Sequence, residues 1–242
     1  MKFKKLKTAL IVILMVIFAV SVFQIVKITY DNKTAEKENT ELQQRFVKKV
    51  AKRQDDKTVQ VPIRIDFEAL QTENNDIVGW IYCPDTPINY PVVKGKDNNQ
   101  YLRADLKGKY LVTGTIFVDY RNGNIGADSN YILYGHNMKN STMFGTLVKY
   151  KEQAYYNAHP IMYYLTPNGN YLIELFAGAV VKDDSDIYQL TPQQATVEDL
   201  KAKSTFVSAF TTDITDSIIT LSTCSYDFNN ARYVLLGRLN KI

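Results

Sequence analysis

Residues 8–26 constrain this chain more than any other stretch, because TALIVILMVIFAVSVFQIV contains no charged residue over 19 positions. At about 1.5 Å of rise per residue, a helix of this length spans roughly the 30 Å hydrocarbon core of a bilayer. Five lysines lie in the first 27 residues, four of them before the apolar segment, and the first acidic residue is Asp31. By the positive-inside rule, this distribution predicts a cytoplasmic N-terminus and an extracellular remainder.

A cleaved signal peptide is the alternative interpretation of this segment, with Ala19-Val20-Ser21 as a weak cleavage site. The apolar region of a signal peptide is usually shorter, about 7–15 residues, so the length favours an uncleaved anchor in the cell membrane. Residues 31–57 are densely charged with few apolar positions, which indicates a helical or partly disordered stalk. We therefore divide the chain into an N-terminal tail and transmembrane anchor (1–27), a charged stalk or N-terminal helix (28–62) and a globular domain (63–242).

The charge of the remainder excludes one class of partner. Removal of the five basic residues in positions 1–27 leaves 29 − 5 = 24 basic and 25 acidic residues, a balance of −1. The domain has no broad cationic surface, which argues against nucleic-acid binding. The only cysteines are Cys83 and Cys224, and they could form one disulfide in an exported domain. Two cysteines give no disulfide framework, so we interpret Cys83 as a small packing residue and Cys224 as a free thiol.

The globular part reads as mostly β structure. Short apolar runs bounded by turn residues predict strands, and Pro167-Asn168-Gly169-Asn170 predicts a hairpin turn. One helix is expected at 191–210, with Thr191 as its cap and Pro192 in its first turn. About eight short strands with one internal helix favour a closed or nearly closed β-barrel. The expected strands are 77–82, 88–93, 113–119, 129–135, 160–166, 170–181 and the two that flank Cys224.

The segment TLSTCSYDFNNARYVLLGRL, residues 220–239, places Cys224 at a strand end and Arg232 at the start of the next apolar run. A nucleophilic cysteine needs a proton donor for the leaving group and a stabiliser for the oxyanion. Of the two histidines, His136 follows a strand beside Gly and Asn, a context that favours it over His159, which lies between tyrosines and a proline. The Arg232 guanidinium suits an oxyanion, although a surface charge is the simpler interpretation of an isolated arginine.

Asp227 follows Cys224 by three residues. Carboxylates orient the histidine in catalytic triads, so Asp227 is a candidate for orienting His136. A solvated loop acid is the alternative interpretation.

These residues resemble a known family. TLSTC with an arginine eight residues later, an upstream GHN and an N-terminal anchor are similar to the sortases, the cysteine transpeptidases of Gram-positive cell surfaces. Several stretches resemble class B in particular: GWIYCPDTPINYPVV, DNNQYLRADLKGKYLVTGTIFVDYRN, YILYGHNM and MFGTL, and the cysteine segment. The resemblance covers the chain from about Ile63 to its end, and the helix before the cysteine strand resembles the class B insertion.

The resemblance implies an eight-stranded sortase-type β-barrel with N-terminal helices and a helix inserted before the cysteine strand. It implies a catalytic trio of His136, Cys224 and Arg232, a substrate groove lined by Asn98, Leu102, Tyr134 and Ser222, and no cofactor or metal site. The expected partners are surface proteins bearing an NPxTx or PxTG sorting signal, and an amine of the peptidoglycan precursor. The sequence leaves open the preferred motif, the acceptor amine, the physiological substrate and the oligomeric state.

Two other functions remain as alternatives at this point. A membrane-anchored cysteine peptidase would pass the acyl group to water, through the same thioacyl intermediate. His136 precedes Cys224 in the chain, whereas papain-like peptidases place the cysteine first, and Cys224 lies between strands and not at a helix start. A non-catalytic wall-binding module would tolerate loss of Cys224 and Arg232, and the joint presence of the trio argues against it.

Overall fold

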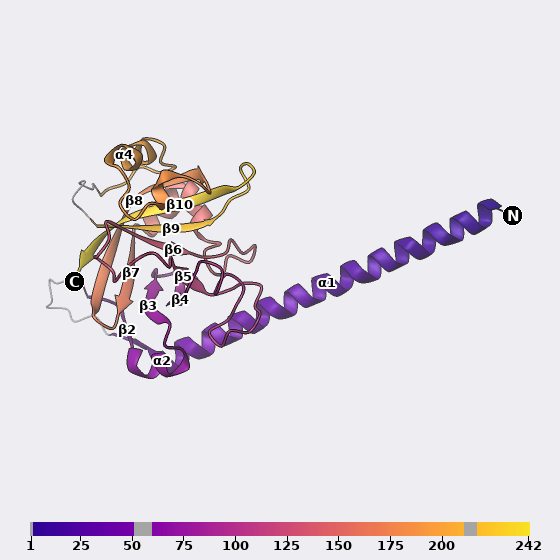
Figure 1. Cartoon of the computed structure of the whole chain (residues 1–242), viewed down its shortest axis with the longest axis horizontal. Helices are drawn as coiled ribbons and strands as arrows, with labels where there is room; N and C mark the ends of the chain where they lie inside the picture. The colour runs from indigo at the N-terminus through magenta and orange to yellow at the C-terminus, as the bar shows by residue number, and fades with distance from the viewer. Residues whose placement is uncertain (1, 51–59, 211–216) are drawn as a thin grey trace.

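The computed structural model of the chain describes residues 2–50, 60–210 and 217–242. Figure 1 shows a barrel at the C-terminal end of the chain, from which one long helix, α1 (Lys2–Phe46), extends far outward. At about 1.5 Å per residue, this 45-residue helix is roughly 68 Å long. The part of the expected stalk at 51–57 lies outside the described residues.

Helix α1 has two parts with different surroundings. Its N-terminal part is long and apolar enough to cross a membrane, and its large apolar side chains are exposed in the described part of the chain. Its C-terminal part docks on the barrel. There the side chains of Asn39 and Gln43 donate to the carbonyl oxygen of Asn89, at 3.4 and 2.9 Å, and Asn140 donates to Glu36 at 2.8 Å.

The barrel is closed, with the strand order β10-β8-β7-β3-β4-β5-β6-β9. Its neighbouring strands are antiparallel except for the pairs β4–β5 and β6–β9, which are parallel. Strands β1 (Val47–Lys49) and β2 (Ile63–Ile65) form a separate two-stranded sheet. The barrel strands are β3 (Ile77–Tyr82), β4 (Asn89–Lys94), β5 (Ile116–Val118), β6 (Asn130–Tyr134), β7 (Ile161–Thr166), β8 (Gly169–Lys182), β9 (Ile218–Cys224) and β10 (Ala231–Lys241).

The barrel interior is filled by apolar side chains from every wall. Ile81, Ile116, Leu133, Tyr164 and Leu235 belong to one buried cluster and come from five different strands. Burial of one such side chain contributes roughly 1.5–3 kcal/mol relative to leaving it exposed. The barrel is therefore a packed core, and open space suitable for a substrate lies at its surface.

The sequence-based strands are confirmed with small shifts in their ends. The expected strand at 113–119 is shorter than predicted and covers Ile116–Val118. The hairpin through Pro167 forms between β7 and β8, where Thr166 pairs with Gly169. The strand pairing of β1 with β2, inside and after the expected stalk, was not anticipated from the sequence.

The helix expected at 191–210 is much shorter in the structure. Helix α4 covers Gln194–Ala202, and its cap is Gln193, so the prediction of Thr191 as the cap was wrong. The chain leaves the helix because Phe206 is buried against Tyr156, with ring centroids 4.1 Å apart. Thr205 also donates its backbone N–H to the Gly178 carbonyl at 2.7 Å. Tertiary contacts have overridden the helical pattern.

The remaining helices are short and lie outside the barrel. They are α2 (Phe67–Glu73), which Asp66 caps by accepting from the Ala69 N–H at 3.1 Å, and α3 (Gln153–Ala158). Two 3₁₀ turns, η1 (Leu147–Lys151) and η2 (Asp186–Tyr188), complete the described elements.

Candidate active site

The hairpin of β9 and β10 brings Cys224 and Arg232 together. Cys224 is the last residue of β9, and in the antiparallel register its Cα lies opposite that of Arg232. Directly opposite residues on neighbouring strands project their side chains from the same face of the sheet. The separation of eight positions in the sequence follows from this geometry, because the six residues of the turn and Ala231, the first residue of β10, lie between the two paired residues.

His136 reaches the same place from β6, the parallel neighbour of β9. Tyr134 pairs with Ser222, and the Thr223 hydroxyl donates to the Gly135 carbonyl at 2.8 Å. The Asn137 side-chain amide donates to the Cys224 carbonyl at 2.8 Å. Because bonds to β9 lie on both sides of His136 in the chain, its backbone is held beside the cysteine strand, and His136 and Cys224 line the same cavity.

The imidazole of His136 has a defined hydrogen-bonding state. Its Nε2 lies 2.7 Å from the carbonyl oxygen of Leu102. A carbonyl oxygen only accepts, so Nε2 carries a proton and donates it, and Nδ1 is the nitrogen left for proton transfer. Burial lowers the pKa of His136 below its ordinary value and the nearby charge of Arg103 lowers it further, while the bond to Leu102 acts in the opposite direction.

The Leu102 carbonyl is itself fixed by close backbone packing. Gly114 has φ of +56°, and a Cβ atom at this position would clash with the Leu102 oxygen. The Thr115 N–H donates to the neighbouring Tyr101 carbonyl at 3.1 Å. Only glycine meets both the conformation and the contact, so Gly114 sets the position of the group that holds His136.

The Arg232 guanidinium lies at the cavity with few strong partners. Its Nη1 donates to the Ala231 carbonyl at 3.1 Å, and its Nη2 lies 3.8 Å from the Asp183 carboxylate. The second distance is longer than a hydrogen bond, so Asp183 does not hold the planar fork tightly. An arginine in this state can turn its donors toward a developing oxyanion.

Cys224, His136 and Arg232 all line one cavity of about 440 Å³. The four residues expected to line a substrate groove, Asn98, Leu102, Tyr134 and Ser222, also line it. The other lining residues are Phe117, Asp119, Arg121, Gly135, Asp183, Tyr188 and Thr223. Sequence positions from 98 to 232 thus meet at one surface of the barrel, as the sequence predicted for the trio.

A buried carboxylate in the wall of the cavity was not predicted from the sequence. Asp119 is fully buried and accepts hydrogen bonds from Arg121 at 2.8 Å, from the Tyr134 hydroxyl at 2.9 Å and from Asn98 at 3.2 Å. Burial alone would raise the pKa of Asp119, but the hydrogen bonds, led by that from Arg121, outweigh it and lower the pKa below its ordinary value. This ion pair fixes two of the expected groove residues. Its position directly after the apolar run TIFV was the available signal.

Tyr188 could not have been found from local sequence. Its hydroxyl lies 2.8 Å from the Ser222 Oγ, and its ring stacks on Tyr134 with centroids 6.1 Å apart. Burial raises the pKa of Tyr188 to about 12, so it is a neutral hydroxyl at physiological pH. It reaches the cavity from the connection between β8 and α4, and that placement depends on the closed barrel.

The two other candidate residues, Asp227 and His159, do not line the cavity around Cys224. Asp227 accepts from Lys151 at 2.7 Å and from the Ser225 hydroxyl, and within the described residues no hydrogen bond joins it to His136. The hydrogen bond from Lys151 lowers the pKa of Asp227. His159 ends α3 and packs on the ring of Tyr155, with centroids 4.6 Å apart. The orienting role expected for Asp227 is therefore not formed, and His159 has the structural setting that its sequence context indicated.

The two cysteines are both free thiols, and no disulfide joins them. Cys83 is buried in the core, as expected of a packing residue, whereas Cys224 is partly exposed. Among the described residues, no group of three or more His, Cys, Asp and Glu side chains is arranged to bind a metal ion.

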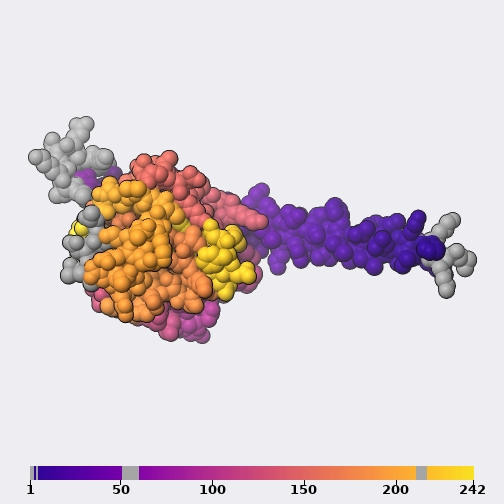
Figure 2. All heavy atoms as spheres, turned by 90° about the horizontal axis from the view of Figure 1, so that it is seen from above, coloured from indigo at the N-terminus to yellow at the C-terminus, as the bar shows by residue number. Residues whose placement is uncertain are grey.

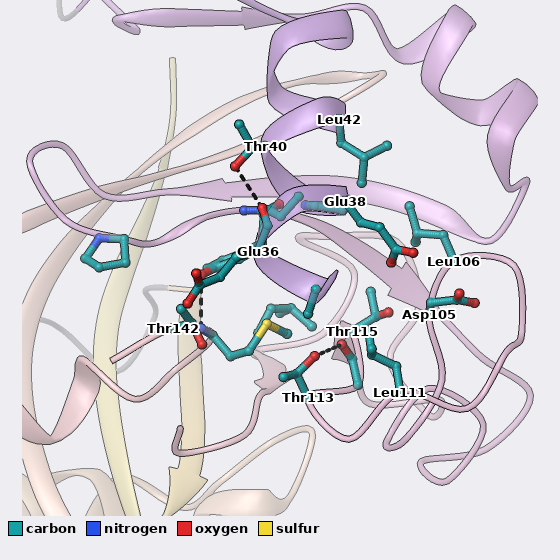
Figure 3. Close-up of a pocket in the computed structure, with 18 residues that line it drawn as sticks. Glu36, Glu38, Thr40, Leu42, Asp105, Leu106, Leu111, Thr113, Thr115 and Thr142 are labelled. Carbon is teal, nitrogen blue, oxygen red and sulfur yellow. Dashed lines mark hydrogen bonds between the residues drawn. The ribbon is translucent and has the colours of Figure 1, made fainter. Parts of the chain in front are cut away.

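A second cavity, of about 300 Å³, lies between α1 and the barrel and is shown in Figure 3. Glu36, Glu38 and Thr40 reach it from α1, and Asp105 and Leu106 from the opposite wall. Its lining, taken over the described part of the chain, contains no cysteine or histidine. Concave space alone therefore does not identify the reactive site of this chain, and the constellation around Cys224 does.

This constellation is suited to covalent acyl transfer. It offers a thiol, an imidazole with a defined tautomer and a guanidinium, around a space large enough for a peptide segment. A thiol nucleophile forms a thioester, a histidine moves the protons of the amine groups, and an arginine stabilises the oxyanion.

Comparison with known proteins gives a consistent result. A family profile described as the sortase domain matches residues 81–240. Sortase B of Staphylococcus aureus (strain NCTC 8325 / PS 47) is 32% identical over 249 aligned positions that cover 100% of both chains. Sortase B of Listeria monocytogenes serovar 1/2a is 39% identical over 186 positions, 73% of this chain and 75% of the relative.

Solved structures agree with these matches. The crystal structure of sortase B from B. anthracis in complex with AAEK1 superimposes with a TM-score of 0.72 at 34% identity, and covers 88% of this chain and 100% of that chain. The Staphylococcus aureus sortase B–substrate complex gives a TM-score of 0.68 at 33% identity, with 73% of this chain and 85% of that chain covered.

Proposed function

This chain belongs to the sortase family and is a cysteine transpeptidase of class B, and we propose that Cys224, His136 and Arg232 carry its reaction. The observation that carries the assignment is the register of β9 and β10, which sets Cys224 opposite Arg232, with His136 held beside β9 from the end of β6. The nucleophile, the proton-transferring group and the stabiliser of the oxyanion are then each supplied by one residue, and all three residues line the same cavity.

In the first proposed step, the Cys224 thiolate attacks the carbonyl carbon of a threonine in the sorting signal. A carbon–sulfur bond forms, and the carbonyl oxygen becomes an oxyanion that Arg232 stabilises. His136, as the imidazolium, donates its Nδ1 proton to the amide nitrogen. The carbon–nitrogen bond breaks, the C-terminal part of the signal leaves as an amine, and a thioester remains on Cys224.

In the second step, an amine attacks the thioester. His136 takes a proton from the attacking nitrogen, a new amide bond forms, and the thiolate of Cys224 leaves. We propose that the amine belongs to a peptidoglycan stem or cross-bridge, and that the signal has an NPxTx or PxTG pattern. The products are a wall-linked protein and the enzyme in its starting state.

The proposed substrate contacts are Asn98, Leu102, Tyr134 and Ser222. The ion pair of Asp119 with Arg121 supports two of them, because Asp119 accepts from both Asn98 and Tyr134. A buried, fully bonded carboxylate keeps the groove wall rigid before the substrate arrives. The Leu102 carbonyl links this wall to the imidazole of His136.

We propose that residues 1–27 anchor the enzyme in the cell membrane with the N-terminus in the cytoplasm. Residues 28–62 are then the stalk, and residues 63–242 are the catalytic domain on the outer side. Sortases act at the cell wall, and the apolar part of α1 is long enough to cross a bilayer once. The lysines before the apolar segment support this orientation.

The test uses the full chain in detergent, incubated with NPxTx and PxTG peptides and with candidate amines, and followed by mass spectrometry. We expect an adduct on Cys224 that ends at threonine and passes to an amine, and no adduct for Cys224→Ala. Release of the free acid alone, with every amine, would indicate a hydrolase. Absence of any Cys224 adduct would contradict the proposed roles.

A further inference from the structure

The turn between β9 and β10, residues 225–230, presents two large apolar side chains to solvent. Tyr226 is 79% exposed and Phe228 is 45% exposed, while most aromatic side chains of the barrel are buried. Single exposed apolar residues are common on soluble proteins. Two in one short turn, directly after the nucleophile strand, indicate a surface that contacts a partner.

Several contacts hold this turn in one conformation. The Ser225 N–H donates to the Ala231 carbonyl at 2.9 Å, and the Ala231 N–H donates to the Phe228 carbonyl at 3.2 Å. Lys151 anchors the turn from outside through its ion pair with Asp227 at 2.7 Å. The pair also balances the one charge of the turn. Tyr226 and Phe228 thus extend from a turn that is held in one conformation and whose only charge is paired.

The turn faces the direction from which α1 arrives. In Figure 1 the β9–β10 turn projects from the barrel in the same direction as the N-terminal part of α1. Figure 2, turned by 90°, shows the same yellow segment on the side of the barrel that faces the outer part of the helix. Two perpendicular views therefore agree on the orientation of this turn.

Only a short part of α1 separates the barrel from the uncharged segment of the helix. The barrel contacts α1 as early as Glu36, through Asn140 at 2.8 Å. Val26, the last residue of the uncharged segment, lies ten positions before Glu36, which is roughly 15 Å along the helix. A turn that projects toward the N-terminal part of α1 enters the space next to the headgroups of a membrane that α1 crosses.

We propose that Tyr226 and Phe228 rest in the interface of the membrane that α1 crosses, so that the protein touches the bilayer at two places. Tyrosine rings are enriched at this depth because they combine an apolar body with a polar hydroxyl. A helix alone leaves the barrel free to change its tilt, and the second contact fixes the height and direction of the cavity. The inference rests on the proposed anchoring by α1.

The experiment places a fluorescent reporter in the turn of the full chain. Trp80 is the single native tryptophan and is fully buried, so it gives a constant background. Tyr226→Trp is reconstituted into phosphatidylcholine vesicles whose lipids carry bromine close to the headgroup. We expect a loss of emission of roughly twofold or more from the new indole, since an interfacial side chain lies at the headgroup–acyl boundary.

The matched control is Ile242→Trp, at the C-terminal residue, which is 42% exposed. Figure 1 marks the C-terminus on the side of the barrel opposite the N-terminal part of α1, and the turn lies on the side toward it. We expect no loss of emission from this indole. Equal quenching, or no quenching, at the two positions would overturn the proposal. A response of the Tyr226→Trp indole to a sorting peptide in place of brominated lipid would also overturn it, and would assign the turn to substrate binding.

Vesicle flotation and peptide turnover of the same samples separate this inference from the proposed function. If the chain fails to float with the vesicles, the proposed anchor is wrong. If the Tyr226→Trp variant floats and turns over peptide without quenching of its new indole, the anchor and the active site stand while the second contact is excluded.

Discussion

The protein contains two regions in which a cysteine lies near a histidine, and they differ in almost every physical respect. Around Cys224 the thiol is partly exposed, His136 offers its side chain, and Arg232 adds a positive charge. Around Cys83 the thiol is fully buried, 3.7 Å from both the Tyr150 hydroxyl and the Ile161 carbonyl.

The histidine of the second region takes part only through its backbone. Tyr150 donates its hydroxyl to the carbonyl of His159 at 2.8 Å, and Tyr155 covers the imidazole. Burial raises the pKa of the Cys83 thiol to about 11, so this cysteine is a neutral packing group at physiological pH. The comparison teaches that residue types do not make a reactive pair. Access, charge and side-chain orientation do.

Replacement of each cysteine by alanine is the strongest test of this contrast. Cys224→Ala removes the nucleophile, and we expect peptide turnover to fall by at least about 10⁴-fold. Cys83→Ala leaves the cavity unchanged, and we expect turnover within about threefold of the original and a loss of about 1–2 kcal/mol in the free energy of unfolding. Turnover assays and chemical denaturation measure the two effects. A folded Cys83→Ala protein without activity would reverse the assignment.

Arg232 tests the role of the positive charge. We expect Arg232→Gln to lower kcat by about 10²–10³-fold, because the oxyanion loses its donor. Arg232→Lys keeps the positive charge without the planar fork of donors. We therefore expect its kcat to lie between that of the original protein and that of Arg232→Gln. Arg238→Gln on the same strand is the matched control, since Arg238 bonds Glu174 at the far end of β10. Steady-state kinetics in which both glutamine variants lose kcat equally would argue for a structural effect.

Gly114 tests whether orientation of the histidine matters. Gly114→Ala would push the Leu102 carbonyl away from His136, and misplacement of about 1 Å can cost up to about 10²-fold in rate. Gly108→Ala is the control, because Gly108 also has a positive φ, of +74°, but a Cβ there meets no atom within 4 Å. We expect kcat to fall about 10–10²-fold for the first variant only. Equal losses in kcat would mean that backbone strain, and not the contact, is responsible.

The smallest expected effect concerns the proton affinity of His136. Its pKa lies below the ordinary value, first because of burial and then because of Arg103. Removal of that charge by Arg103→Gln should raise the pKa of His136 slightly, because solvent screens an exposed charge and burial remains the larger cause. An NMR titration measures it, with His159→Gln to assign the two histidine signals. An unchanged or lower pKa would contradict the electrostatic explanation.

The lowered pKa of His136 also makes the free energy of unfolding depend on pH. The unfolded chain binds this proton more readily than the folded chain, so its share of stability is present above the unfolded pKa of about 6.5 and is lost as the pH falls toward the folded pKa. Denaturant midpoints measured between pH 7 and pH 5 should decrease less for His136→Gln than for the original protein. An identical decrease would mean that other groups carry the acid sensitivity.

The sequence predicted most of the fold because its strands carry local signals. Alternating or continuous apolar runs mark them, and turn residues such as Pro167 and Asn168 mark their ends. It failed where a tertiary contact outweighed a local preference, as with Phe206, which is buried against Tyr156 and ends α4 early.

The site shows the same division. Cys224 and Arg232 were predictable because one hairpin fixes both, and His136 because it follows a strand signal. The supporting residues Asp119 and Tyr188 depend on contacts between distant segments, which no local pattern contains. Asp227 shows the opposite failure, since closeness in sequence to Cys224 suggested a contact that Lys151 takes instead.

The parallel pairing of β6 with β9 has a consequence for the stage of folding at which the enzyme becomes active. His136 and Cys224 are 88 positions apart in the sequence, and their strands meet only where the barrel closes. Contacts of such long range form slowly, because the entropy of closing the loop must be overcome before the pairing is gained. Since β9 and β10 also follow the other described barrel strands in the sequence, we expect a partly folded molecule to lack the reactive pair, and only a molecule with a completed barrel to transfer acyl groups.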